Sequence, residues 1–175
     1  MTRLKEKTAI VTGGGKGIGQ AIARRFAREG YTACVTRRRE ASLAPLVDEI
    51  EAAGGRARAF GCDARDEDAM VALFNTVEAE VGPVEVVVFN IGANVNFPIR
   101  DTTARVYRKV WEMAAFAGFL AGREAARVMV PRQKGTLIFT GATASLRGGP
   151  GFSAFAGAKF ALRALAQSLA RELGP

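Results

Sequence analysis

Short apolar runs alternate with stretches of helical periodicity along almost the whole chain. Strands are expected at residues 8–12, 31–36, 56–60, 84–89 and 136–140. Helices are expected between them, including a long one over residues 103–130 and a last one over residues 153–173. Strands that alternate with helices through short turns form parallel βαβ units. The pattern therefore predicts an α/β fold, a doubly wound parallel sheet with helices on both faces.

The length and composition favour one soluble domain. The chain has 175 residues, of which 49% are hydrophobic and 24% charged, as is usual for a globular protein. Its longest apolar stretches, residues 84–89 and 114–121, are too short to span a bilayer. Residues 1–7 lack a secretory pattern. We expect a single domain over residues 1–175, a cytoplasmic location and no membrane association.

The absence of histidine excludes several kinds of chemistry. No Ser-His-Asp or Cys-His arrangement and no imidazole general base can exist. Cys34 and Cys62 are the only cysteines, and two cysteines without histidine cannot form a tetrahedral zinc site. We therefore expect no metal site, and we interpret both cysteines as small buried residues of a reducing compartment.

The net charge of +8 permits two interpretations. One is a nucleic-acid-binding surface, and the other is a basic surface with a site for an anionic ligand. The arginines are scattered over several predicted helices, apart from one run at residues 37–39. No zinc-finger spacing or RNP-like aromatic motif accompanies them. A nucleic-acid partner is therefore not expected.

A glycine-rich segment at residues 12–19, Thr-Gly-Gly-Gly-Lys-Gly-Ile-Gly, joins the first strand to the first helix. Glycines there let backbone N–H groups approach a pyrophosphate at the helix N-terminus. A Walker A loop is excluded, because Lys16 is followed by Gly17 and not by serine or threonine. The placement predicts a Rossmann-type dinucleotide site. Its expected contact residues are Gly13, Gly15, Lys16, Gly17, Ile18 and Gly19.

The end of the second strand indicates which dinucleotide is bound. An NAD site places an acid there to hold the ribose 2′-hydroxyl, whereas this chain has Arg37 and Arg38. Guanidinium groups pair with a 2′-phosphate, which an acid would repel, and Lys16 adds positive charge nearby. The simpler interpretation is that these arginines are only solvated. We predict that NADP(H) is preferred over NAD(H).

These motifs resemble those of the short-chain dehydrogenase/reductase family. Its TGxxxGxG loop matches residues 12–19. Its acid after the third strand, which contacts the adenine, matches Asp63, and Ala64 follows it. Its NNAG turn after the fourth strand is similar to residues 90–93, with Asn90 at the first position and Gly92 at the third. The resemblance implies that these residues contact the cofactor.

The family's YxxxK element is similar to residues 155–159, and here the sequence departs from the pattern. In the family, a tyrosine protonates the substrate oxygen, and a lysine four residues later holds the nicotinamide ribose. A serine orients the carbonyl, and an asparagine supports a proton relay. This chain retains Lys159, but Phe155 stands at the tyrosine position. Ala142 stands at the serine position and Ala114 at the asparagine position.

Neighbouring hydroxyl groups offer partial substitutes. Thr143, next to the serine position, is the candidate for orienting a carbonyl, with a bound water as the proton source. The alternative is that Thr143 is an ordinary turn or cap residue. The same two interpretations apply to the other nearby hydroxyls, Thr140, Ser145 and Ser153.

The resemblance also bears on completeness and assembly. Family members usually continue past a helix like the last one into two further strands and a substrate-covering segment. This chain ends at Pro175, so those last strands are missing, through either a fragmentary record or a natural truncation. In the family, the long helix and the last helix pack against a partner subunit. We therefore expect a homo-oligomer, in agreement with the apolar segment 114–121.

The leading functional hypothesis is an NADP(H)-dependent oxidoreductase acting on a small-molecule carbonyl or alcohol, with an atypical catalytic site. The alternative is a catalytically inactive NADP-binding protein, either a sensor or a partner subunit. A nucleic-acid binder is the remote alternative. The sequence identifies neither the substrate nor the direction of the reaction.

Overall fold

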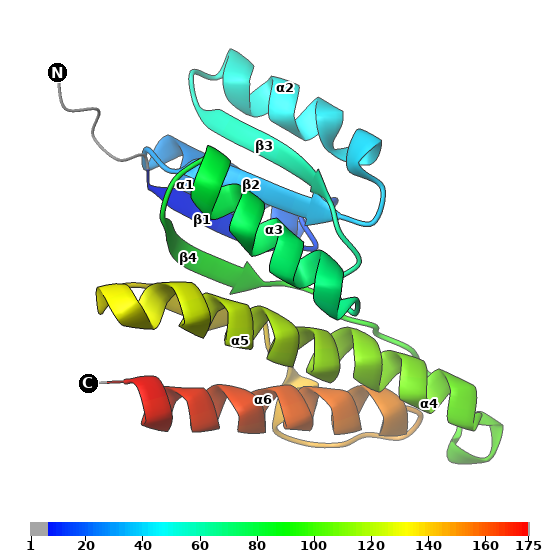
Figure 1. The fold of residues 1–175 in the computed structure, drawn as a ribbon. Helices are drawn as coiled ribbons and strands as arrows, with labels where there is room; N and C mark the ends of the chain where they lie inside the picture. The colour runs from blue at the N-terminus through cyan, green and yellow to red at the C-terminus, as the bar shows by residue number, and fades with distance from the viewer. Residues whose placement is uncertain (1–6, 175) are drawn as a thin grey trace, which may run out of the picture.

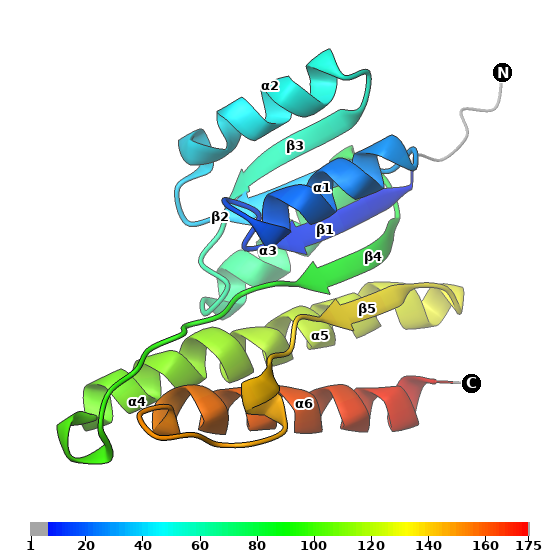
Figure 2. The ribbon, with the colours of Figure 1, turned by 180° about the vertical axis from the view of Figure 1, so that it is seen from behind.

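The computed structural model describes residues 7–174, and its centre is one five-stranded sheet. The strand order is β3-β2-β1-β4-β5, and every neighbouring pair is parallel (Figures 1 and 2). The order reverses at β1, which pairs with β2 on one side and with β4 on the other. The strands are β1 (Thr8–Thr12), β2 (Thr32–Arg37), β3 (Arg56–Gly61), β4 (Val84–Phe89) and β5 (Thr136–Phe139). The predicted doubly wound parallel fold is confirmed.

Helices cover both faces of the sheet. One face carries α1 (Ile18–Arg28) and α2 (Ala44–Ala52), and the other carries α3 (Glu67–Glu80) and α5 (Ala117–Met129) (Figures 1 and 2). The last helix, α6 (Ser153–Leu173), lies alongside α4 (Ala104–Trp111) and α5. Its side chains pack closely on α5, because a Cβ atom at Gly122 would lie 2.9 Å from Leu169 Cδ1.

The strands read as continuous apolar runs because both of their faces are buried. In β4, Val87 and Phe89 belong to the core under α3 and α5, whereas Val86 and Val88 pack on the α1 side. All residues of β1 are buried. The edge strand β5 is less covered, and Ile138 is 42% exposed. Among residues 7–174, no helix is long and apolar enough to cross a membrane.

The long helix predicted over residues 103–130 is interrupted. After α4 comes a π-helical turn, Glu112–Phe116, before the α-helix resumes as α5. The turn adds a residue to one coil of the helix, a feature that is frequent at functional sites. The apolar segment 114–121 is buried on more than one side, as expected, with Ala114, Leu120 and Ala121 fully covered. Phe119 points outward and is 42% exposed.

Candidate cofactor-binding and active site

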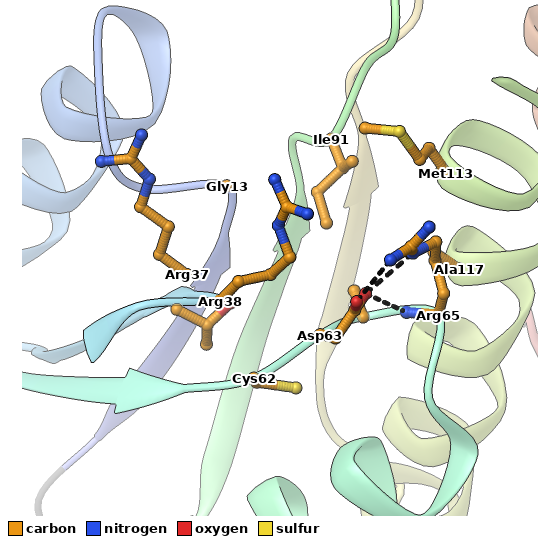
Figure 3. Close-up of a pocket in the computed structure, with 11 residues that line it drawn as sticks. Gly13, Arg37, Arg38, Cys62, Asp63, Arg65, Ile91, Met113 and Ala117 are labelled. Carbon is orange, nitrogen blue, oxygen red and sulfur yellow. Dashed lines mark hydrogen bonds and ion pairs between the residues drawn. The ribbon is translucent and has the colours of Figure 1, made fainter. Parts of the chain in front are cut away.

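The predicted site residues lie at the carboxyl ends of the parallel strands. The glycine-rich loop follows β1, Arg38 follows β2, Asp63 follows β3 and Asn90 follows β4. In open α/β sheets, ligands bind at this edge, next to the point where the strand order reverses. The structure therefore brings together residues from four loops that are far apart in the sequence (Figure 3).

The glycine-rich loop leaves the N-terminus of α1 accessible to an anion. Gly17 is the N-cap residue, with φ of 54°, and no side chain caps the helix. Nothing lies within 4 Å of a Cβ atom at Gly17, so glycine is needed there for the backbone conformation. At Gly19 a Cβ atom would collide with the carbonyl oxygen of Gly13. Lys16 and Ile18, the other predicted contacts, are exposed on the loop.

The side chains of Arg37 and Arg38 diverge from the end of β2. Arg37 crosses the glycine-rich loop, since a Cβ atom at Gly15 would lie 2.7 Å from its Cδ, and its Nη1 donates to Ser42 Oγ at 3.2 Å. Arg38 extends toward Ile91 (Figure 3). Within residues 7–174, neither guanidinium group forms an ion pair with a carboxylate. The charge of Arg38 nevertheless helps to lower the pKa of Asp63, so an acid lies near it, whereas Arg37 lies against the glycine-rich loop.

A pocket opens between these loops. Five predicted cofactor residues line it, together with six residues that were not predicted to contact the cofactor. The lining residues are Gly13, Thr36, Arg37, Arg38, Cys62, Asp63, Ala64, Arg65, Ile91, Met113 and Ala117 (Figure 3).

Asp63 at the pocket wall is held by Arg65. Arg65 Nε donates to Oδ1 at 3.0 Å and Nη2 donates to Oδ2 at 2.6 Å. The backbone N–H of Arg65 also donates to Oδ1, at 3.2 Å. The hydrogen bond from the Arg65 side chain is the main reason why the pKa of Asp63 lies below its usual value. Asp63 therefore presents an ionised carboxylate to the pocket.

Asn90 ties the glycine-rich loop to the end of β4. Its backbone N–H donates to Thr12 Oγ1 at 3.2 Å, and its side-chain Nδ2 lies 3.5 Å from the carbonyl oxygen of Gly13. Thr12 Oγ1 in turn donates to the carbonyl oxygen of Val88 at 3.2 Å. A Cβ atom at Gly92 would lie 3.9 Å from Lys159 Nζ. The turn after β4 is thus fixed between the phosphate loop and the retained lysine.

Lys159 is a buried amine between the ends of β4 and β5. Its side chain reaches from α6 to the carbonyl oxygen of Thr140 at 2.7 Å and to that of Ile91 at 3.4 Å, and the residue is 3% exposed. Burial lowers the pKa of the ammonium group, since removal from water disfavours the charged form. The ammonium group carries three donors, so the two carbonyl groups leave one for a ligand.

The positions that differ from the family pattern carry apolar side chains. Phe155 lies four residues before Lys159 on α6, with its ring centroid 6.5 Å from that of Phe152. Ala114, in the π-helical turn, packs in an apolar cluster with Ala154 and Ala158 of α6. The structure therefore offers no proton donor at the tyrosine or asparagine position.

The hydroxyl groups near the serine position lie in a short 3-10 turn, Thr143–Ser145. Ala142 N–H donates to Ser145 Oγ at 3.1 Å, so Ser145 acts as a turn residue. Thr143 is exposed, and Ser153 Oγ is buried without a hydrogen-bond partner in the described part of the chain.

Of the two cysteines, Cys62 lines the pocket and Cys34 does not. Both are buried and free, and burial raises the pKa of Cys34 to about 12 and that of Cys62 to about 11. Both thiols are therefore protonated at neutral pH. Within residues 7–174, no group of histidine, cysteine or acidic side chains is placed to hold a metal ion.

Comparison with known proteins identifies the family. The sequence model described as short chain dehydrogenase matches residues 7–175. The chain belongs to this family. A short chain dehydrogenase of Pseudocercospora fijiensis is 36% identical over 173 residues, which are 98% of this chain and 56% of that protein. The chain thus spans little more than half the length of this relative.

Solved structures agree with the fold. A short-chain dehydrogenase from Rhodopseudomonas palustris superposes with a TM-score of 0.92 and 60% identity, covering 95% of this chain and 78% of that one. A metagenomic short-chain oxidoreductase in complex with NADP gives a TM-score of 0.90 and 30% identity, covering 96% and 76% of the two chains. Proteins of this family bind nicotinamide cofactors.

Proposed function

We propose that this chain binds NADP(H) in preference to NAD(H) and forms the cofactor half of an oxidoreductase acting on a carbonyl or alcohol. The observation that carries the proposal is the pair Arg37 and Arg38 at the end of β2, which form no ion pair among residues 7–174, with Arg37 lying against the glycine-rich loop. A 2′-phosphate next to the loop would meet two guanidinium groups and Lys16. One structural relative is described with NADP bound, in keeping with this proposal.

The residues present fit a nicotinamide dinucleotide along the whole strand edge. The uncapped N-terminus of α1 suits the pyrophosphate, and the pocket beside Asp63 suits the adenine. Asn90 and Gly92 would form the wall near the nicotinamide ribose, with Lys159 donating to its hydroxyl groups.

The bound nicotinamide would supply or accept a hydride, and the chain's own residues would orient the reactants. Lys159 would fix the ribose, and the ring of Phe155 would exclude water from one side. Neither Phe155 nor Ala142 can donate a proton, so a bound water would have to supply it, with Thr143 as the candidate to orient the carbonyl. The substrate itself is a small carbonyl or alcohol compound.

The apolar replacements favour a second candidate function. The tyrosine, serine and asparagine positions carry Phe155, Ala142 and Ala114, and Ala114 packs in a closed apolar cluster. A protein that keeps the phosphate loop and Lys159 but lacks all three polar groups is suited to binding without turnover. The alternative is therefore an NADP-binding sensor or partner subunit.

We also propose that residues 1–175 form one nucleotide-binding domain that assembles as a homo-oligomer in the cytoplasm. The surface that favours assembly runs along α4 and α5. There the rings of Trp111, Phe116 and Phe119 stack in a row with centroid separations of 6.1 and 6.2 Å. Trp111 and Phe119 are each 42% exposed.

The cofactor proposal is tested by titrating the purified chain with NADPH and NADH while nicotinamide fluorescence is followed. We expect tight NADPH binding and weaker NADH binding. In Arg37→Glu and Arg38→Glu, NADPH affinity should fall about tenfold to a hundredfold more than NADH affinity, the scale of one charge-assisted hydrogen bond. Arg39→Glu is the matched control, since Arg39 does not line the pocket. Equal losses for both cofactors would contradict the proposed preference.

A further inference from the structure

Arg65 was not singled out from the sequence, yet its side chain makes two hydrogen bonds to Asp63 at the wall of the pocket. Asp63 and Arg65 both line the cavity between the strand ends (Figure 3). Their side chains are only partly covered, with 34% and 29% of their surfaces exposed. The pair therefore lies at the wall where a ligand would contact it, and not in the protein interior.

The geometry of the pair restricts what Asp63 can accept. An ionised carboxylate has about four lone-pair sites. The backbone N–H and the Nε of Arg65 occupy two of these sites on Oδ1. Its Nη2 occupies one site on Oδ2. One acceptor site is left, on Oδ2. A two-point contact between planar groups also fixes the plane of the carboxylate.

Arg65 contributes to a second hollow in addition to the first pocket. Asp63 also lines it, and its other walls include Asp66 and Glu112. The Glu112 carboxylate raises the pKa of Arg65 in addition to the larger effect of Asp63. Acidic side chains therefore lie near Arg65 on the side of this second hollow as well.

We propose that Arg65 is a positioning residue for base recognition. It holds the Asp63 carboxylate so that its free acceptor site takes a hydrogen bond from the exocyclic amino group of a 6-aminopurine. A 6-oxopurine presents a carbonyl oxygen at that place, and two facing acceptors repel. The pocket therefore selects adenine over hypoxanthine through Arg65. The inference rests on the proposed dinucleotide binding.

The test compares NADPH with its hypoxanthine analogue, in which a carbonyl oxygen replaces the 6-amino group. Dissociation constants are measured by nicotinamide fluorescence for the wild-type chain, Arg65→Ala, Arg65→Lys and Asp63→Asn. Arg123→Ala is the control, because Arg123 also forms an exposed ion pair, with Glu67, but lies outside the pocket. Circular dichroism checks that each variant is folded. The ratio of the dissociation constants for NADPH and NADH shows whether recognition of the distant 2′-phosphate has changed.

We expect the wild type to prefer NADPH over the analogue by about tenfold or more, as for one hydrogen bond to a charged acceptor. In Arg65→Ala this preference should fall by about threefold or more, because the carboxylate can then rotate. Arg65→Lys should restore part of it, and Asp63→Asn should nearly abolish it. The NADPH-to-NADH ratio should stay unchanged in Arg65→Ala.

Two results would overturn the role of Arg65 alone. Equal loss of affinity for NADPH and the analogue in Arg65→Ala would mean that the arginine only maintains the fold. Tighter NADPH binding in Arg65→Ala would mean that Arg65 competes with the base for Asp63. A folded wild-type chain that binds none of the dinucleotides would instead overturn the proposed function, and this inference with it.

Discussion

Phe155 and Lys159 lie one helical turn apart on α6, and only Lys159 can exchange a proton. A positioned general acid contributes about a hundredfold to ten-thousandfold to a reaction rate. If a carbonyl substrate binds next to Phe155, then Phe155→Tyr should increase NADPH-dependent reduction by about tenfold or more, a threshold set below that range because Ala142 remains at the serine position. The measurement is the rate of NADPH oxidation with a panel of ketones and aldehydes.

The control for this variant is Phe152→Tyr, which introduces the same hydroxyl group three residues away on the neighbouring ring. It should leave the rate unchanged. An unchanged rate in Phe155→Tyr, with normal NADPH binding, would favour the binding protein over the enzyme.

Burial of Lys159 leads to a prediction about how the stability of the protein depends on pH. Its folded-state pKa is lowered by desolvation, so the unfolded chain binds more protons between that value and the ordinary lysine value of about 10.4. Stability should therefore rise with pH across this window. In Lys159→Met the rise should disappear, as measured by urea unfolding between neutral pH and pH ~10.4. Lys109→Met, at an exposed site on α4, should keep it.

The sequence allowed some site residues to be predicted, but not all of them. Asp63 was predicted from the resemblance to the family, and the glycine-rich loop from its place between the first strand and the first helix. Asp63 and Gly13 both line the pocket. Arg65 was missed, because a contact between residues two apart depends on the local turn and has no periodic signal. Met113 was missed since it enters the pocket from the π-helical turn, which periodicity does not reveal.

Individual elements follow from local chemistry, as the start of α3 illustrates. Asp66 is its N-cap, and its side chain accepts a hydrogen bond from the N–H of Ala69 at 3.0 Å. Asp66→Ala should lower the free energy of unfolding by about 1 kcal/mol, the usual cost of losing such a cap. Asp68→Ala is the control in the same helical turn, and it should cost less because Asp68 is not the capping residue and contributes through the helix dipole. Urea denaturation measures both, and equal costs would contradict the capping role.

Element boundaries were predicted well where burial dominates. The predicted and observed spans of β4 coincide, because its residues are covered on both faces. The last helix also begins and ends where its apolar spacing predicted. The long helix differed from the prediction, because it contains a π-helical turn. Such a turn is a small local change, and the spacing of apolar residues in a long apolar segment does not reveal it.

At the scale of the whole molecule, the aromatic row on α4 and α5 predicts association. Exposed aromatic rings in a contiguous row are typical of interfaces. Light scattering at micromolar concentration should give an oligomer for the wild type, and Phe119→Glu should shift it toward the monomer. Ile99→Glu introduces the same charge at a 71% exposed site before α4, and it should leave the oligomer unchanged. A monomeric wild type would contradict the proposed assembly.

The central place of β1 has a consequence for how the chain is made. β1 gains its second neighbour only when β4 joins it, and the Thr12 hydroxyl reaches across 76 residues to the carbonyl group of Val88. At a ribosomal rate of about 5–20 residues per second, the bare edge of β1 waits about 4–15 s for its partner. Contacts this distant in sequence form slowly, and an unpaired strand edge invites pairing with other nascent chains. We expect the yield of this protein to depend on the rate of translation and on chaperone supply during that interval.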